Sequence, residues 1–168
     1  MLRRNSTRCR TMLAGVLIVF SLSSSQTIRT IDADGFDSLR THRNGRTLVL
    51  NIWATWCTPC REEFPDLVTL SKDLKSKTVD FAAISVDYPD EIDSKILPFL
   101  KPLAVPFPVF VSDFPAADQL INAVDSTWSG AIPATIVYAP DGKQRIFLKG
   151  KHSYSQFKKA VEDVLAKP

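Results

Sequence analysis

The segment that most restricts the fold is a run of seven mostly apolar residues, Thr47–Trp53, with the sequence TLVLNIW. Its β-forming side chains show no polar alternation, which is typical of a strand buried on both faces of a sheet. A helical pattern follows almost at once, because apolar side chains recur at helical spacing between Thr58 and Lys75. A buried strand that leads directly into a helix favours an α/β fold, in which helices cover the sheet.

Strands and helices alternate through the rest of the chain. Before this unit we expect a short strand at Ile28–Ile31 and a helix at Asp34–His42, and after it a strand at Val79–Asp87. The later predicted elements are a helix at 89–103 interrupted by Pro98, a strand at Phe107–Asp113, a helix at 115–125, a hairpin of 134–139 and 144–150, and a closing helix at 153–167. The pattern predicts one α/β domain with a mixed sheet.

The first 25 residues have the pattern of a targeting segment. Four arginines (Arg3, Arg4, Arg8 and Arg10) precede the 11-residue apolar stretch Met12–Leu22, and three serines follow it. The stretch is shorter than the ~20 residues that a membrane-spanning helix needs. We therefore predict a signal peptide at 1–25, either cleaved or retained as an anchor, and a folded domain at 26–168. The domain is expected to be periplasmic or otherwise exported, and to meet a membrane only if the leader is retained.

Charge excludes one class of partner. The chain has 21 basic and 18 acidic residues, and removing the four leader arginines leaves 17 basic against 18 acidic residues. A domain with a net charge near −1 lacks the basic surface that nucleic acids require, so we expect no nucleic-acid partner.

Cys57 and Cys60 are the only cysteines after the leader, which holds Cys9. Cys57 lies where the predicted helix begins, and the free N–H groups and dipole of a helix N-terminus stabilise a thiolate. Cys60 follows one turn later on the same face, close to disulfide geometry. A disulfide between them closes a very short loop, so it would stabilise the fold little. The pair therefore predicts a reactive dithiol.

Three other roles for the cysteines remain open but are less favoured. A zinc site needs four ligands, and outside the leader only His42 and His152 are available beside the two cysteines, so we expect no metal and no other cofactor. A non-catalytic binding module or copper chaperone would use the same dithiol. A cysteine peroxidase is disfavoured because no Thr-x-x-Cys stretch precedes a helix.

The residues around the dithiol resemble a known family. WATWCTPC resembles the active-site signature of the thioredoxin superfamily, and NIWATWCTPCREEFPDL is similar to its exported TlpA/ResA-type branch. In GAIPATIVYAPDGK, Pro133 falls where that superfamily has a cis-proline, 76 positions after Cys57. The segment between Pro89 and Asp125 resembles the βα insertion of this branch. The resemblance implies a thioredoxin fold, with a mixed central sheet in a three-layer α/β/α arrangement.

The resemblance also implies an activity, thiol–disulfide exchange. Cys57 is expected to attack a substrate disulfide, and Cys60 to resolve the mixed disulfide. Pro133 would place the backbone of Ile132 beside Cys57, where Trp56, Thr58 and Pro59 also contact substrate. We expect the enzyme to reduce disulfides of exported proteins; apocytochrome c is a typical substrate of this branch, and a membrane dithiol is its typical electron donor.

One position departs from the superfamily pattern. Thioredoxins have a buried aspartate on the strand before the motif as proton acceptor for the second cysteine, and this chain has Asn51 there. We expect Asp87, at the end of the next strand, to take that role, with Tyr88 as the other residue that fits the position. Glu62 and Glu63, in the first helical turn, are expected to face solvent, with tuning of the thiolate as the alternative.

Overall fold

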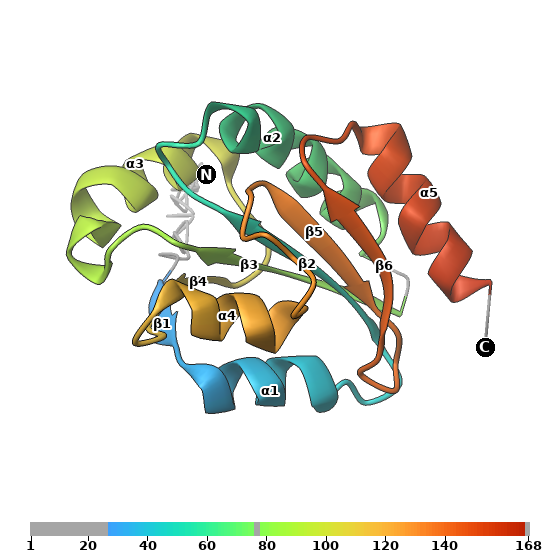
Figure 1. The fold of residues 1–168 in the computed structure, drawn as a ribbon. Helices are drawn as coiled ribbons and strands as arrows, with labels where there is room; N and C mark the ends of the chain where they lie inside the picture. The colour runs from blue at the N-terminus through green and yellow to red at the C-terminus, as the bar shows by residue number, and fades with distance from the viewer. Residues whose placement is uncertain (1–26, 76–77, 167–168) are drawn as a thin grey trace, which may run out of the picture.

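The computed structural model describes residues 27–75 and 78–166. The predicted signal peptide lies outside these residues and stays a prediction. The described part forms one six-stranded sheet with helices on both faces (Figure 1), which confirms the three-layer α/β/α arrangement. The strands are β1 (Arg29–Ile31), β2 (Thr47–Trp53), β3 (Val79–Ser85), β4 (Val109–Ser112), β5 (Ala134–Tyr138) and β6 (Gln144–Lys149).

The sheet is mixed, as predicted. Its strand order is β1-β4-β3-β2-β5-β6. The pairs β1–β4, β4–β3 and β3–β2 are parallel, whereas β5 runs antiparallel to β2 and β6 antiparallel to β5. The inserted segment therefore adds β4 to the sheet between β1 and β3, and α4 (Ala117–Val124) follows it.

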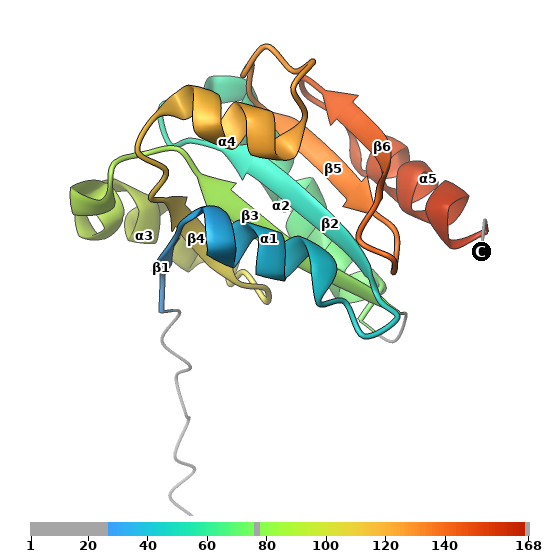
Figure 2. The same cartoon turned by 60° about the horizontal axis from the view of Figure 1, so that its bottom comes forward.

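Two apolar cores lie on the two faces of the sheet. Helices α1 (Ala33–Thr41) and α4 cover one face, and α2 (Thr58–Asp73) and α5 (Tyr154–Leu165) cover the other (Figures 1 and 2). Strand β2 contributes to both cores, since Leu48, Leu50 and Ile52 face α1 and α4 while Val49 and Trp53 face α2 and α5. All seven residues of β2 are buried, which confirms the prediction of a strand covered on both sides.

The prediction of a helix at 89–103 with one interruption is wrong, because the segment is divided into four short helical pieces. The segment consists of a 3-10 turn (Pro89–Glu91), a π-helical turn (Ile92–Ile96), the short α3 (Leu97–Leu100) and a second 3-10 turn (Lys101–Leu103). Proline has no N–H to donate, and Pro89, Pro98 and Pro102 each lie at the start of one of these pieces. The chain therefore restarts its helical hydrogen bonding at each proline.

No helix within the described ranges is long and apolar enough to cross a membrane.

Candidate active site

The two cysteines form a disulfide at the start of α2. The S–S distance is 2.03 Å and the Cα atoms lie 5.2 Å apart. Cys57 is the N-cap of α2, and its Sγ accepts a hydrogen bond of 3.3 Å from the backbone N–H of Cys60. Cys57 is 6% exposed and Cys60 is fully buried. Both residues are therefore buried, and only Cys57 keeps any exposed surface.

Local sequence explains why the sulfur of Cys57 lies at the helix end. β2 ends at Trp53, and the Cys57 N–H donates back to the carbonyl of Ala54 in a tight turn before the helix begins. Thr58 and Pro59 are exposed in the first turn of α2. A proline at this place removes no hydrogen bond, because the first N–H groups of a helix have no partner within it.

The Ile132–Pro133 peptide bond is cis, as the resemblance implied. β5 pairs antiparallel with β2 so that Ala134 is opposite Ile52, which brings Pro133 to the end of β2 that leads to Cys57. The carbonyl of Pro133 accepts a 2.9 Å hydrogen bond from the N–H of Gly150. Ile132 and Trp56 line the same pocket, of about 690 Å³. The structure thus brings together these three predicted site residues beside the dithiol.

Asp87 lies in the loop after β3, which ends at Ser85 and not at Asp87 as predicted. The carboxylate is buried and fully engaged with neutral donors. The Thr55 N–H donates to Oδ2 over 2.8 Å, the Thr55 hydroxyl donates to Oδ1 over 2.6 Å, and the Ser85 hydroxyl also donates to Oδ2. Asp87 therefore holds the turn before Cys57 against the end of β3. Tyr88, the alternative to Asp87, is 73% exposed.

Glu63 contradicts the expectation that it faces solvent. It is 1% exposed and lies on the inner face of α2, three residues after Cys60. Its Oε1 accepts a 3.0 Å hydrogen bond from Asn51 Nδ2, and its Oε2 accepts one of 2.9 Å from the backbone N–H of His152. Burial raises the pKa of Glu63 to about 7, against these two hydrogen bonds, which lower it.

A sequence signal for Glu63 did exist. Cys60, Glu63, Phe64 and Leu67 have the i, i+3, i+4, i+7 spacing of one helix face, so Glu63 belongs to the apolar stripe of α2. The prediction that Glu63 faces solvent followed from its charge and did not use this spacing.

Asn51 completes a buried polar group around Glu63. Its Nδ2 also donates to the hydroxyl of Thr135 over 2.9 Å, whereas its Oδ1 is buried without a hydrogen-bond partner among the described residues. The position of the thioredoxin aspartate is thus occupied by an amide that contacts a neighbouring carboxyl group.

The segment 151–154, between β6 and α5, covers Glu63 through several contacts with α2. The Lys151 ammonium pairs with Glu62, the Tyr154 N–H donates to Asp66 over 2.9 Å, and the Tyr154 hydroxyl donates to Asp73 over 2.7 Å. Together with the bond from His152 to Glu63, these contacts fix the segment on the helix. Water reaches Glu63 poorly as a result, which is consistent with its raised pKa.

No group of three or more His, Cys, Asp or Glu side chains in residues 27–75 and 78–166 is placed to hold a metal ion.

Comparison with known protein families shows to which family this chain belongs. Residues 25–145 match the AhpC/TSA family, and this range includes the dithiol, Glu63 and Pro133. The chain belongs to the AhpC/TSA family.

Two proteins named as thiol–disulfide oxidoreductases are similar to this chain. The thiol–disulfide oxidoreductase ResA of Bacillus subtilis is 35% identical over 101 residues, which cover 59% of this chain and 50% of the relative. ResA of Geobacillus thermodenitrificans is 26% identical over 133 residues, covering 79% of this chain and 71% of the relative. This chain thus spans about half the length of the Bacillus subtilis relative.

Solved structures agree with the fold and with the predicted superfamily. A thiol:disulfide interchange protein of the thioredoxin family from Chlorobium tepidum superposes with a TM-score of 0.62 and 28% identity, over 74% of this chain and 83% of that chain. A thioredoxin-related protein from Neisseria meningitidis gives 0.62 and 29%, over 73% and 87%. These similarities confirm the thioredoxin fold and support thiol–disulfide exchange as the chemistry of the dithiol.

Proposed function

We propose that this protein is a thiol–disulfide oxidoreductase that reduces disulfides of exported proteins. The observation that carries the proposal is the Cys57–Cys60 disulfide at the N-terminus of α2, in which Cys57 keeps 6% exposure and Cys60 keeps none. A sulfur at a helix N-terminus, with a fully buried partner one turn away, suits a nucleophile and its resolving thiol.

The proposed cycle transfers two electrons from the reduced dithiol to the substrate. The Cys57 thiolate attacks one sulfur of the substrate disulfide, forms a mixed disulfide and releases the other sulfur as a thiolate. The Cys60 thiol then loses its proton and attacks the sulfur of Cys57. The mixed disulfide breaks, the substrate leaves as a dithiol, and the Cys57–Cys60 disulfide remains. A dithiol donor must reduce this disulfide before the next cycle.

Glu63 is the proposed acceptor for the proton of Cys60. The thiol of Cys60 is buried, so a nearby base must take its proton before it attacks. Glu63 lies three residues later on the same helix, and side chains at that spacing are neighbours, with Cβ atoms ~5–6 Å apart. A pKa of about 7 lets the carboxyl group take up and return a proton near neutral pH.

Asn51 supports both protonation states of Glu63. When Glu63 is ionised, Asn51 Nδ2 donates to it, as in the structure. When Glu63 is protonated, an amide turned by 180° presents its Oδ1 to the Glu63 O–H, and the Thr135 hydroxyl can donate to the same oxygen. An aspartate at position 51 would instead place two carboxyl groups together.

The predicted role of Asp87 as the proton acceptor stays a separate hypothesis. Its two oxygens already accept three hydrogen bonds from Thr55 and Ser85, so we propose that Asp87 positions the turn before Cys57.

Substrate is proposed to lie across the exposed side of the dithiol. The backbone of Ile132 has no hydrogen bond to any described residue, so it can pair with an extended substrate segment. Trp56, at 65% exposure, and the exposed Thr58 and Pro59 would contact the same segment. Pro133 would hold Ile132 in that place.

The setting of this activity is also a proposal. The basic and apolar leader in residues 1–25 supports export, to the periplasm or an equivalent compartment. By family resemblance, we propose a membrane dithiol as electron donor and apocytochrome c as one substrate.

The experiment measures the reduction of insulin disulfides by dithiothreitol, with turbidity of the precipitating insulin as the readout. The wild-type protein should accelerate the reaction, and Cys57→Ser should abolish the acceleration. A wild-type protein that closes its disulfide reversibly but accelerates neither this reaction nor oxidation of a reduced peptide would overturn the proposal. In that case capture of copper or of a protein partner by the dithiol would take its place.

A further inference from the structure

A groove lined largely by apolar side chains includes Trp56, the residue before Cys57, and residues of the inserted segment. It is the pocket of about 690 Å³ that Trp56 and Ile132 line, and its other walls include Tyr88, Phe114, Ile121 and Trp128. We call it the Trp56 groove. Its volume lies in the range of about 300–1,000 Å³ that is typical of ligand pockets.

Two exposed aromatic rings border this groove. Among the described residues the large apolar side chains that are exposed are Trp56, Tyr88 and Leu165, and the two aromatic ones both line the groove. Aromatic side chains at the edge of an apolar hollow are typical of surfaces that bind another chain, because they bury a large area at a low cost in entropy.

The part of the groove wall that holds Trp128, Gly130 and Ile121 is closely packed. Trp128 is buried and its indole N–H donates to the carbonyl of Ala131 over 3.0 Å. Gly130 has a φ of +81°, and a Cβ there would lie 2.6 Å from Cδ1 of Ile121. The segment before Pro133 therefore packs closely on α4, and the groove is formed before any substrate arrives.

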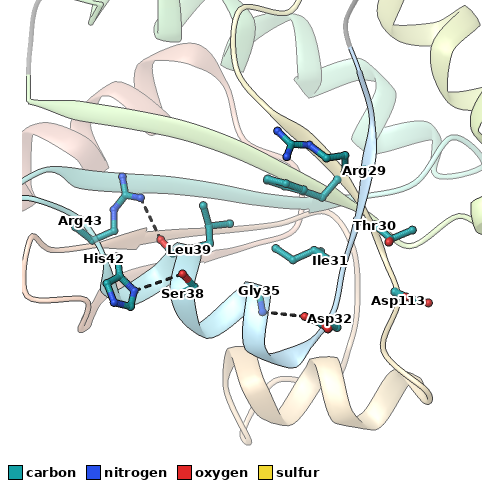
Figure 3. A pocket seen from close by; sticks show the side chains of 11 residues that line it. Arg29, Thr30, Ile31, Asp32, Gly35, Ser38, Leu39, His42, Arg43 and Asp113 are labelled. Atoms are coloured by element: carbon teal, nitrogen blue, oxygen red, sulfur yellow. Dashed lines mark hydrogen bonds between the residues drawn. The ribbon is translucent and has the colours of Figure 1, made fainter.

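The charge of the groove has one sign. The charged residues that line it are Asp87 and Asp113, and no lysine or arginine of the described chain lines it. Asp113 is exposed on the segment that follows β4 (Figure 3) and makes no ion pair with another described residue. Asp90, which follows the lining residue Pro89, is exposed, whereas the charge of Glu91 is paired with Lys95.

A neighbouring pocket differs from the groove in its charge. That pocket, of about 440 Å³, lies between β1 and α1 and also contains Asp113 (Figure 3). It is lined in addition by Arg29, His42 and Arg43, so its charge is mixed. A basic partner is therefore favoured in the groove and not in the pocket.

We propose that the Trp56 groove binds the substrate chain next to its disulfide and selects segments that combine a large apolar side chain with basic residues. The apolar side chain packs against Tyr88, Phe114 and Ile121, and a basic side chain faces Asp113. This inference rests on the proposed function, because the groove is useful to the reaction only if the Cys57 thiolate attacks a disulfide held beside it.

The test uses three peptides, each with one cysteine in a mixed disulfide with nitrothiobenzoate. All three carry a leucine beside the cysteine, and they differ in two further neighbours, which are lysines, serines or glutamates. The reduced full-length protein reacts once with each peptide, and release of the chromophore gives the second-order rate constant. The small probe 2-hydroxyethyl disulfide, which cannot reach along the groove, measures the reactivity of the dithiol alone.

We expect the lysine peptide to react about two- to fivefold faster than the serine peptide and the glutamate peptide to react slower, as for a single exposed ion pair. Asp113→Asn should remove most of that preference. Asp118→Asn is the matched control, because Asp118 is exposed on α4 and does not line the groove. This variant should keep the preference for the lysine peptide. Ala117→Gln, which fills the groove without a charge, should slow all three peptides and leave 2-hydroxyethyl disulfide unaffected.

Equal second-order rate constants for the three peptides, or a preference that Asp113→Asn leaves intact, would overturn the inference. A reduced wild-type protein that does not react with 2-hydroxyethyl disulfide would instead contradict the proposed function itself. The two failures are therefore distinguishable in one set of measurements.

Discussion

Glu63 lies inside the interface between α2 and the sheet, where burial raises its pKa to about 7. Only the ionised carboxylate can accept the proton of Cys60, so the rate at which Cys60 resolves a mixed disulfide should rise with pH through about 7. Glu63→Gln should lose this inflection and slow the step by about 10²-fold at pH 7. Stopped-flow decay of a preformed mixed disulfide between pH 5 and 9 measures it. An unchanged inflection would remove Glu63 from the mechanism.

The same residue should make stability depend on pH. A carboxyl group whose pKa rises from 4.5 to about 7 on folding binds its proton more tightly in the folded state. Its contribution to the free energy of unfolding is therefore fully present below pH 4.5 and is lost as pH rises through about 7. At 1.36 kcal/mol for each pH unit, the loss is up to about 3 kcal/mol.

Glu63→Gln stays neutral at every pH, so its stability relative to the wild-type protein should increase between pH 4.5 and 8. Urea denaturation at the two pH values measures the change. Glu62→Gln is the matched control, because Glu62 is an exposed neighbour whose ion pair with Lys151 is open to solvent. Parallel pH profiles for Glu63→Gln and the wild-type protein would show that Glu63 titrates normally.

Asp87 should matter for structure more than for proton transfer. Asp87→Asn turns one acceptor oxygen into an N–H₂ group that faces the donors of Thr55 or Ser85. The loss should lower the free energy of unfolding by about 1–3 kcal/mol and leave the pH inflection of resolution in place. Loss of the inflection with normal stability would instead support Asp87 as the proton acceptor.

Among the elements, α5 is attached to α2 through its first turn. The Tyr154 N–H is one of the unpaired donors at the start of α5, and Asp66 of α2 accepts its hydrogen bond. Asp66→Ala should lower the free energy of unfolding by about 1 kcal/mol, as loss of a helix cap does. Asp73→Ala removes only the exposed contact with the Tyr154 hydroxyl and should cost less in the same urea titration. An equal cost for both would contradict the capping role.

The bounds of helices and strands could be predicted where the sequence pattern is strong, and could not where no residue type marks the end of the element. The apolar run of β2 and the helical spacing of α2 gave bounds close to the observed Thr47–Trp53 and Thr58–Asp73. In Val79–Asp87 no glycine or proline marks the end, so the strand was predicted two residues too long. Between residues 89 and 103 the three prolines divide a pattern that was otherwise apolar and helical.

At the scale of the whole molecule, the parts of the site that were predicted lie in local motifs. Cys57, Cys60 and Pro133 were placed from short stretches of sequence, and the disulfide and the cis peptide bond agree with them. The buried polar group was missed because Asn51, Glu63, Thr135 and the N–H of His152 come from β2, α2, β5 and the segment before α5. Only the tertiary fold brings these four together.

The same holds for the Trp56 groove. Its walls come from the turn before α2, the loop after β3, the segment that joins β4 to α4, and the residues before Pro133. All four lie where strands of one sheet end or begin, so the order of the strands determines which loops meet (Figure 2). No periodicity in the sequence carries that information.

The central claim is that Cys57 attacks the substrate and Cys60 resolves the mixed disulfide. The most direct measurement is intact-mass spectrometry of Cys57→Ser and Cys60→Ser, each mixed in the reduced form with a disulfide-bonded peptide. The account predicts a stable one-to-one adduct through Cys57 in Cys60→Ser and no adduct in Cys57→Ser. An adduct that forms on Cys60 in Cys57→Ser, while Cys60→Ser forms none, would contradict it.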